Sequence, residues 1–303
     1  MNLLIILPIF LIVLAGWLFR KFKIAADDWT GVLNKFVYYV SLPAIIAVSL
    51  WDIDFLNPNY LKTIFHGFLM IILFSLAVFI FLSFLKIGRD KKAAIFLTAT
   101  TGNTVYMGFP LVELSYGKIS YLSGALIGTI YLIVPILISI FVIRFWHSKE
   151  HRLSKELYEF FKNPLVISVF FGVVLGLLRP DYPFFLALKK SLSMLGATAS
   201  PAALFALGGF LYGKFLKKNL GLLALSSFLK IFGFALFIIA LNLFLFKIPN
   251  LKIFVLQSVM PVAVTTFVIS EKFKLDSDLV ANSILVSTIL SFAVVPFMVF
   301  IFS

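Results

Sequence analysis

One stretch of the chain combines polar side chains, two glycines and a proline inside an otherwise apolar segment. It runs over residues 99–110 and carries three threonine hydroxyls and the amide of Asn103. In hydrocarbon an unpaired backbone N–H or C=O is costly, so irregular backbone persists only where it is buried in protein or lines a wet cavity. The stretch therefore predicts an unwound helix at a binding site within a membrane span.

A second stretch of the same character follows at residues 257–266, around Pro261. Two broken segments in corresponding places are typical of secondary transporters, whose substrate binds where the breaks meet. The polar and aromatic residues of both stretches are the expected substrate-binding residues. They are Thr101, Gly102, Asn103, Thr104, Tyr106, Thr265 and Thr266.

Each of these side chains also has a purely structural alternative. The amide of Asn103 supplies two donors and an acceptor, which suits a carboxylate, but Asn is also a preferred helix N-cap. Both roles are compatible, because a helix N-terminus itself attracts anions. The threonines can bond within their own helices, and Tyr106 can pack between helices instead of lining a ligand.

Three further residues are expected to act as hinges that keep the half-helices apart: Gly108, Pro110 and Pro261. Proline cannot donate the helical hydrogen bond to the fourth residue before it, and its ring clashes with the preceding turn.

Two ionisable residues inside apolar segments are candidates for a fixed charge or for coupling. Lys230 lies about 15 Å along its span, which is deep for a charged group. It either supplies positive charge at a break, forms an ion pair with Glu113, or snorkels to the interface. Glu113 is either a proton or cation ligand or an interfacial carboxylate.

The composition places these stretches in a polytopic membrane protein. Of 303 residues, 62% are hydrophobic and only 13% are charged, unlike a soluble domain. An all-α fold with about ten membrane spans is expected. The spans are predicted at 3–19, 31–50, 61–85, 93–112, 119–143, 163–178, 187–212, 220–246, 251–271 and 279–301.

The net charge of +13 comes from Lys and Arg in short loops, where basic residues orient a membrane protein. Their distribution predicts a cell-membrane protein with both termini outside, and no nucleic-acid partner. The absence of cysteine excludes disulfides and thiolate sites, and no P-loop or hydrolase motif occurs. We expect no enzymatic activity, no cofactor and no metal. His147 and His151 are spaced for a metal pair, but a solvated linker is the favoured interpretation.

The two halves of the chain share ordered features. A proline is followed by a glycine eight residues later in the first span, at Pro8 and Gly16, and in the sixth, at Pro164 and Gly172. Five spans per half makes the repeats inverted. The expected organisation is a first repeat at 1–143, a cytoplasmic linker at 144–162 and a second repeat at 163–303.

The chain resembles the auxin efflux carrier family, which includes bacterial carriers and the plant PIN proteins. The resemblance covers nearly the whole chain and rests on five motifs in order, at 34–44, 102–117, 200–209, 260–263 and 287–296. It implies crossover helices at spans four and nine, a scaffold of spans 1, 2, 6 and 7, and a mobile transport domain of spans 3–5 and 8–10. Thr265 and Thr266 stand where many members have Asn.

The resemblance also implies export or exchange of organic anions and a homodimer within the lipid bilayer. The function expected is an elevator-type secondary transporter of small organic anions. Two alternatives stay open: a sodium- or proton-coupled symporter like the bile-acid symporters, and a membrane sensor without transport.

Overall fold

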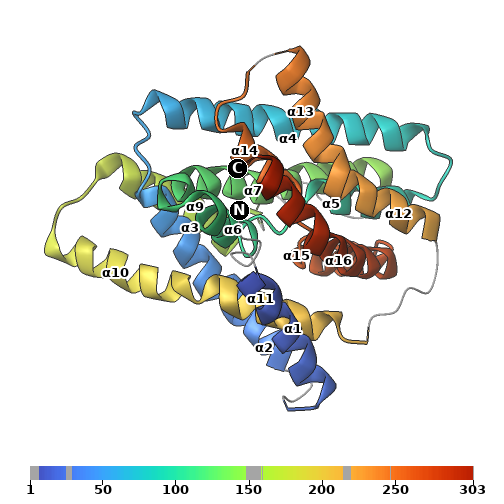
Figure 1. Ribbon diagram of the computed structural model, residues 1–303, viewed down its shortest axis with the longest axis horizontal. Helices are drawn as coiled ribbons and strands as arrows, with labels where there is room; N and C mark the ends of the chain where they lie inside the picture. Colours follow the sequence, from blue (N-terminus) through green and yellow to red (C-terminus); the bar gives the residue numbers. More distant parts are fainter. Residues whose placement is uncertain are drawn as a thin grey trace.

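Helices make up the regular structure of the residues that the computed structural model describes, which are 7–24, 29–147, 158, 160–213, 220–245 and 247–302. Within these ranges there is no strand, so the predicted all-α class is confirmed (Figure 1). The first half contains α1 (Leu7–Lys21), α2 (Trp29–Phe36), η2 (Val37–Ser41), α3 (Leu42–Trp51), α4 (Pro58–Phe84), α5 (Arg89–Thr100), α6 (Gly108–Tyr116) and α7 (Lys118–His147). The second half contains α9 (Pro164–Leu178), α10 (Pro183–Ala197), α11 (Ala199–Leu211), α12 (Leu220–Phe228), η3 (Leu229–Gly233), α13 (Phe234–Phe244), α14 (Leu251–Ser258), α15 (Thr265–Lys272) and α16 (Ser277–Ile301).

Six helical segments of the described chain are long and apolar enough to cross a membrane. They are Trp29–Trp51, Pro58–Phe84, Lys118–Trp146, Pro183–Leu211, Leu220–Phe244 and Ser277–Ile301. The helices α1 and α9 have 15 residues each, and the fourth and ninth expected spans are interrupted. A multi-pass membrane protein follows from these helices; the count of about ten spans in inverted repeats stays a prediction.

The helical path breaks at both places where the polar stretches predicted it. The first interruption separates α5 from α6, and Thr101 there has the extended angles φ −103° and ψ 110°. The second separates α14 from α15 around Pro261, which has no N–H to continue a helix. The interruptions are shorter than the predicted stretches, because helix resumes at Gly108 and at Thr265.

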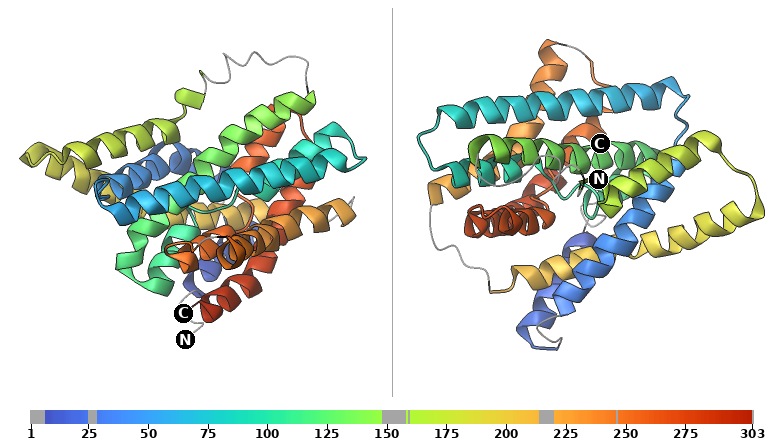
Figure 2. Two further views of the ribbon diagram at one scale, coloured as in Figure 1. Left: turned by 90° about the horizontal axis from the view of Figure 1, so that it is seen from above. Right: turned by 180° about the vertical axis from the view of Figure 1, so that it is seen from behind.

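The helices pack in two groups. In the first, α1 and α2 contact α11, and α3 contacts α9 and α10. In the second, α7 contacts α4, α5, α6 and α14, while α16 contacts α5, α12, α14 and α15. Figure 1 shows α1, α2 and α10 together on one side and α4 on the other, and Figure 2 shows α4 running beside α7. Among the contacts between the groups is that of α3 with α7.

Glycines allow the tightest crossing within the first group. A Cβ at Gly16 in α1 would collide with the backbone carbonyl of Phe205 in α11, and a Cβ at Gly208 in α11 would collide with the carbonyl of Val13. Small residues let membrane helices approach this closely, where dispersion and weak polar contacts hold them. The helices α1 and α11 are therefore packed backbone to backbone at this crossing.

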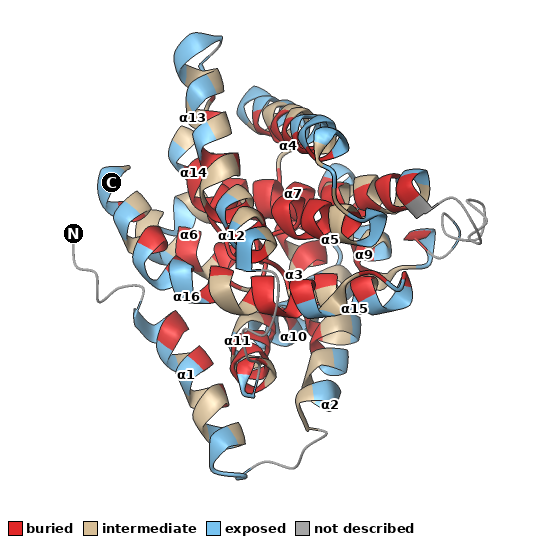
Figure 3. Ribbon diagram, turned by 90° about the vertical axis from the view of Figure 1, so that its right-hand side faces the viewer, coloured by how far each residue is buried: buried red, intermediate tan, exposed pale blue. Residues whose placement is uncertain are grey.

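Buried residues concentrate where α5, α7 and α14 lie (Figure 3). Ile95 of α5, Ile127 of α7 and Phe254 of α14 are each 0% exposed. The interruptions emerge directly from this packed centre, so their polar groups are held in protein and away from lipid.

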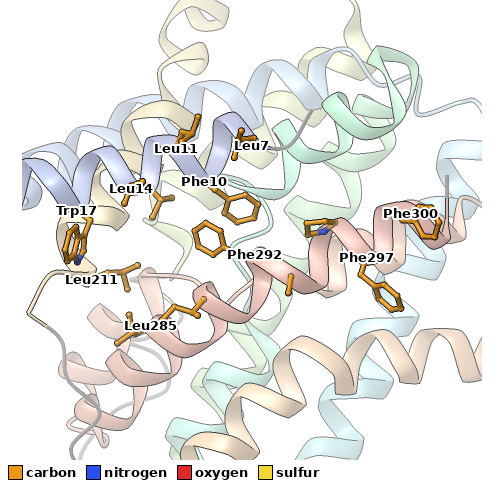
Figure 4. Close-up of a pocket in the computed structure, with 14 residues that line it drawn as sticks. Leu7, Phe10, Leu11, Leu14, Trp17, Leu211, Leu285, Phe292, Phe297 and Phe300 are labelled. Atoms are coloured by element: carbon orange, nitrogen blue, oxygen red, sulfur yellow. The ribbon is translucent and has the colours of Figure 1, made fainter. Parts of the chain in front are cut away.

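An apolar groove of about 1070 Å³ runs between α1 and α16 (Figure 4). Its lining includes Phe10 and Trp17 of α1 and Phe292 and Phe297 of α16. The lining has no charged, hydroxyl or amide side chain, so the groove is unsuited to an organic anion.

Only part of the linker expected at 144–162 lies among the described residues. α7 continues to His147, past the predicted end of the fifth span. The histidine pair considered for a metal lies outside the described side chains, since His151 and the side chain of His147 are not among them.

Candidate functional site

The two interruptions pair with each other through their main chains. Gly102 and Val262 form an isolated antiparallel β-bridge. The N–H of Asn103 donates to the carbonyl of Pro261 over 2.7 Å, and the N–H of Ala263 donates to the carbonyl of Thr101 over 3.2 Å. Backbone groups released by the breaks thus satisfy one another, as the bilayer interior requires.

Asn103 lies at this junction with an unengaged side chain. The residue is 3% exposed, and its amide group makes no hydrogen bond to the described chain. The alternative that Asn103 caps the second half-helix is wrong, because the N-cap of α6 is Met107. Asn103 instead uses its main-chain carbonyl, which accepts from the N–H of Met107 at 3.3 Å and of Gly108 at 3.2 Å.

The four threonines divide into two kinds. Thr104 donates to the carbonyl of Gly128 in α7 at 2.7 Å, and Thr266 bonds back to Ala263 at 2.7 Å. The hydroxyls of Thr101 and Thr265 are buried and have no partner within the described chain. A buried hydroxyl without a partner is uncommon, so these two are the threonines available to a ligand.

The expected hinge residues occupy different positions. Pro261 lies inside the second interruption, buried against the first. Gly108 and Pro110 lie in the first turn of α6, where a missing N–H removes no helical bond. Tyr106, between Asn103 and this turn, is partly buried and packs against an apolar cluster that includes Val105.

Gln257 belongs to the same centre, although the sequence reasoning did not single it out as a site residue. It is 0% exposed, and its Nε2 donates to the carbonyl of Gly124 in α7 at 3.0 Å. Its Oε1 has no partner in the described chain and lies where a Cβ at Gly108 would be. The sequence does contain a signal for this residue: a glutamine in the last turn of an apolar half-helix, four residues before a proline.

Ser287 is a second residue that was not expected at the site. Its hydroxyl accepts from the N–H of Val262 at 3.0 Å, which ties the second interruption to α16. Ser287 is 0% exposed, and its own hydroxyl donates to Ile284 at 3.2 Å.

Lys230 reaches the junction from η3. It is 1% exposed, and its Nζ donates to the carbonyl of Ser258, the last residue of α14, at 2.8 Å. Snorkelling is therefore wrong, since the ammonium is buried. Glu113 is partly exposed on α6 and forms no ion pair with Lys230 in the described chain, so that alternative is also wrong.

The junction collects the ends of four half-helices. The carbonyl ends of α5 and α14 and the N–H ends of α6 and α15 all border the two interruptions. Partial negative charge gathers at the former and partial positive charge at the latter. Within the described residues no group of three His, Cys, Asp or Glu side chains could hold a metal ion. The arrangement offers an anion donors from amides and helix N-termini.

Comparison with known proteins shows the family of the chain. A family described as "Membrane transport protein" matches residues 3–299. The chain belongs to this family. The resemblance to the auxin efflux carriers is thereby confirmed.

Two archaeal relatives extend over nearly the same length as this membrane transport protein. An uncharacterized transporter of Methanocaldococcus jannaschii is 26% identical over 307 residues, covering 96% of each chain. An uncharacterized transporter of Methanothermobacter thermautotrophicus is 24% identical over 294 residues, covering 96% of this chain and 95% of its own. Neither name states a substrate.

Proposed function

We propose that this membrane transport protein is a secondary carrier of small organic anions, which bind where the two interruptions pair. The observation that carries the proposal is the junction itself. At the Gly102–Val262 bridge, two broken helices meet beside the unengaged amide of Asn103. Discontinuous helices with opposed ends are the structural element that secondary transporters use to bind substrate.

The polar groups of the junction favour an anion over a cation. The amide of Asn103 can donate two hydrogen bonds, and the hydroxyls of Thr101 and Thr265 can donate one each. The N-termini of α6 and α15 add positive potential. No carboxylate cluster that would attract a metal cation occurs in the described residues. A carboxylate group fits this donor-rich site.

The packing of the helices supports an elevator mechanism, in which the site moves with one group of helices against the other. Both interruptions belong to the group built on α7 and α16, and the other group is held together by the close α1–α11 crossing. The apolar groove between α1 and α16 lies on the boundary of the two groups. The boundary is apolar along this groove, and a hydroxyl bond between Ser49 of α3 and Tyr121 of α7 crosses it elsewhere.

Uptake into proteoliposomes tests the proposal. Purified protein is reconstituted with unlabelled carboxylate inside, and entry of radiolabelled acetate, succinate or citrate is followed. We expect saturable exchange of at least one acid, and its loss in Asn103→Ala. Exchange that appears only with a sodium or proton gradient would favour the coupled symporter. Absence of saturable uptake of any acid would contradict the proposal and favour the sensor.

A further inference from the structure

Lys230 is a buried lysine with no acidic partner in the part of the chain that the structure describes. Its ammonium has three N–H donors, and one of them is used, by the carbonyl of Ser258. The centroid of the Phe234 ring lies 5.9 Å from its Nζ. Of the ion pairs found in the described chain, those of Asp54 with Arg179 and Asp52 with Lys189 lie on the exposed surface. An isolated charge in a low-dielectric interior is strongly unfavourable, and pairing with an anion removes much of that cost.

About one turn of chain before Lys230 and the junction, three buried hydroxyls hydrogen-bond to one another. Thr98 of α5 bonds Ser226 of α12 at 2.7 Å, and Ser226 donates to Ser283 of α16 at 2.9 Å. Each is 0% exposed. These three hydroxyls, which we call the hydroxyl layer, already have hydrogen-bond partners and are not expected to bind a ligand.

The segments that follow this layer form the junction: the residues just past α5, the turn η3 and the next turn of α16. Four residues after the members of the hydroxyl layer come Gly102, Lys230 and Ser287. Ser287 holds the N–H of Val262, and Val262 bridges Gly102. Lys230 therefore follows the hydroxyl layer along the chain, and its ammonium reaches the carbonyl of Ser258 beside the second interruption.

Gly102 makes room for the lysine. A Cβ at this position would lie 2.9 Å from Cε and 3.0 Å from Nζ of Lys230. These contacts are too short for carbon and nitrogen atoms, so any larger residue displaces the ammonium. The glycine of the β-bridge and the ammonium thus occupy adjoining space at the site.

We propose that the Lys230 ammonium is the counter-charge of the substrate anion, so that binding requires no metal cation. The inference rests on the proposed anion-carrier function and specifies how that site is neutralised. The ammonium stabilises the carbonyl end of α14 in the empty protein, and its remaining donors face the anion when substrate is bound. A tethered charge takes the place that a co-transported cation would fill.

The test measures thermal unfolding of the purified full chain with acetate, succinate or citrate. Each acid is added in sodium buffer and in N-methylglucamine buffer at equal ionic strength, because a ligand that binds the folded state raises the unfolding midpoint. We expect the same midpoint rise in both buffers. We expect Lys230→Met to weaken binding of that acid by about 10-fold to 100-fold. The matched control is Lys35→Met, since Lys35 is an exposed lysine in α2 and its loss leaves binding unchanged.

A second pair of variants tests whether Gly102 and Lys230 affect binding through the same ammonium group. Gly102→Ala is expected to weaken binding by pushing the ammonium aside. Combined with Lys230→Met it should produce little further loss, because both changes act through one group. Additive losses would contradict the shared mechanism.

The outcomes distinguish the inference from the proposed function. A midpoint rise that requires sodium, or an unchanged rise in Lys230→Met, overturns the inference and leaves the anion carrier standing. A rise in the wild-type midpoint caused by sodium without any carboxylate overturns the inference independently of the substrate. If no carboxylate changes the midpoint in either buffer, the proposed function fails, and the inference fails with it.

Discussion

The main-chain N–H of Asn103 donates a 2.7 Å hydrogen bond to the carbonyl of Pro261. These residues lie in different halves of the chain, and the bond joins the two interruptions at their centre. It leaves the side chain of Asn103 unengaged in the described structure while its backbone is fixed. A pre-positioned amide binds a ligand with little loss of conformational entropy.

Asn103→Ala is predicted to weaken organic-anion binding by about 1–3 kcal/mol, the range for losing a hydrogen bond to a charged group. Asn103→Asp should weaken it more, because it sets a negative charge against the anion. The fold should survive both changes, since the backbone bond to Pro261 is kept. Titration calorimetry of the three proteins measures the effect. Equal affinities would mean that Asn103 has a structural role alone.

Pro261→Ala is predicted to abolish transport while the protein still folds in detergent. Alanine restores an N–H and a high helix propensity, so α14 can extend into the interruption and disturb the Gly102–Val262 bridge. Proteoliposome exchange and size-exclusion profiles measure the two parts. Wild-type exchange rates in this variant would contradict the hinge role.

Gly208→Ala is predicted to destabilise the protein by about 1–3 kcal/mol, as overpacking does. The added methyl meets the backbone carbonyl of Val13, which cannot rotate away as a side chain would. Gly221→Ala is the control, because a Cβ at this exposed position of α12 contacts nothing within 4 Å. Unfolding midpoints in one detergent compare the variants. Equal midpoints for both would show that α1 and α11 separate easily.

Ser226→Ala is predicted to lower stability by about 1 kcal/mol, because it removes the central member of the hydroxyl layer. Ser191→Ala is the control, since the exposed hydroxyl of Ser191 bonds only to Ala187 on its own helix. The same unfolding measurement applies. If Ser226→Ala is as stable as the control variant, the hydroxyl layer does not stabilise the fold.

Much of the architecture could be predicted because apolar length and helix-breaking residues are local signals. Both interruptions were expected where they occur, and the depth of Lys230 within its span was expected from its distance to the end of that span. The family resemblance was correct. Proline position was less informative, because Pro110 lies in the first turn of α6 and outside the interruption.

Other features depend on which helices meet, and one sequence does not contain that information in local form. From the sequence alone, Ser226 and Ser283 are expected to bond within their own helices. Their mutual hydrogen bond follows only from the packing of α12 against α16. Gln257 gains its partner only because α7 presents Gly124 to it. The π-helical turn that carries Lys230 also gave no composition signal.

The most direct test of the paired interruptions as the substrate site uses the absence of cysteine from the chain. Single variants Thr265→Cys, at the junction, and Ser193→Cys, on the exposed surface of α10, are reconstituted and labelled with a membrane-permeable maleimide. Because alternating access must expose the site to water in part of the cycle, the account predicts slow labelling at position 265. The acid that exchanges in proteoliposomes should protect position 265 and leave labelling at position 193 unchanged. Labelling at position 265 that is absent, or that the acid does not affect, would contradict the account.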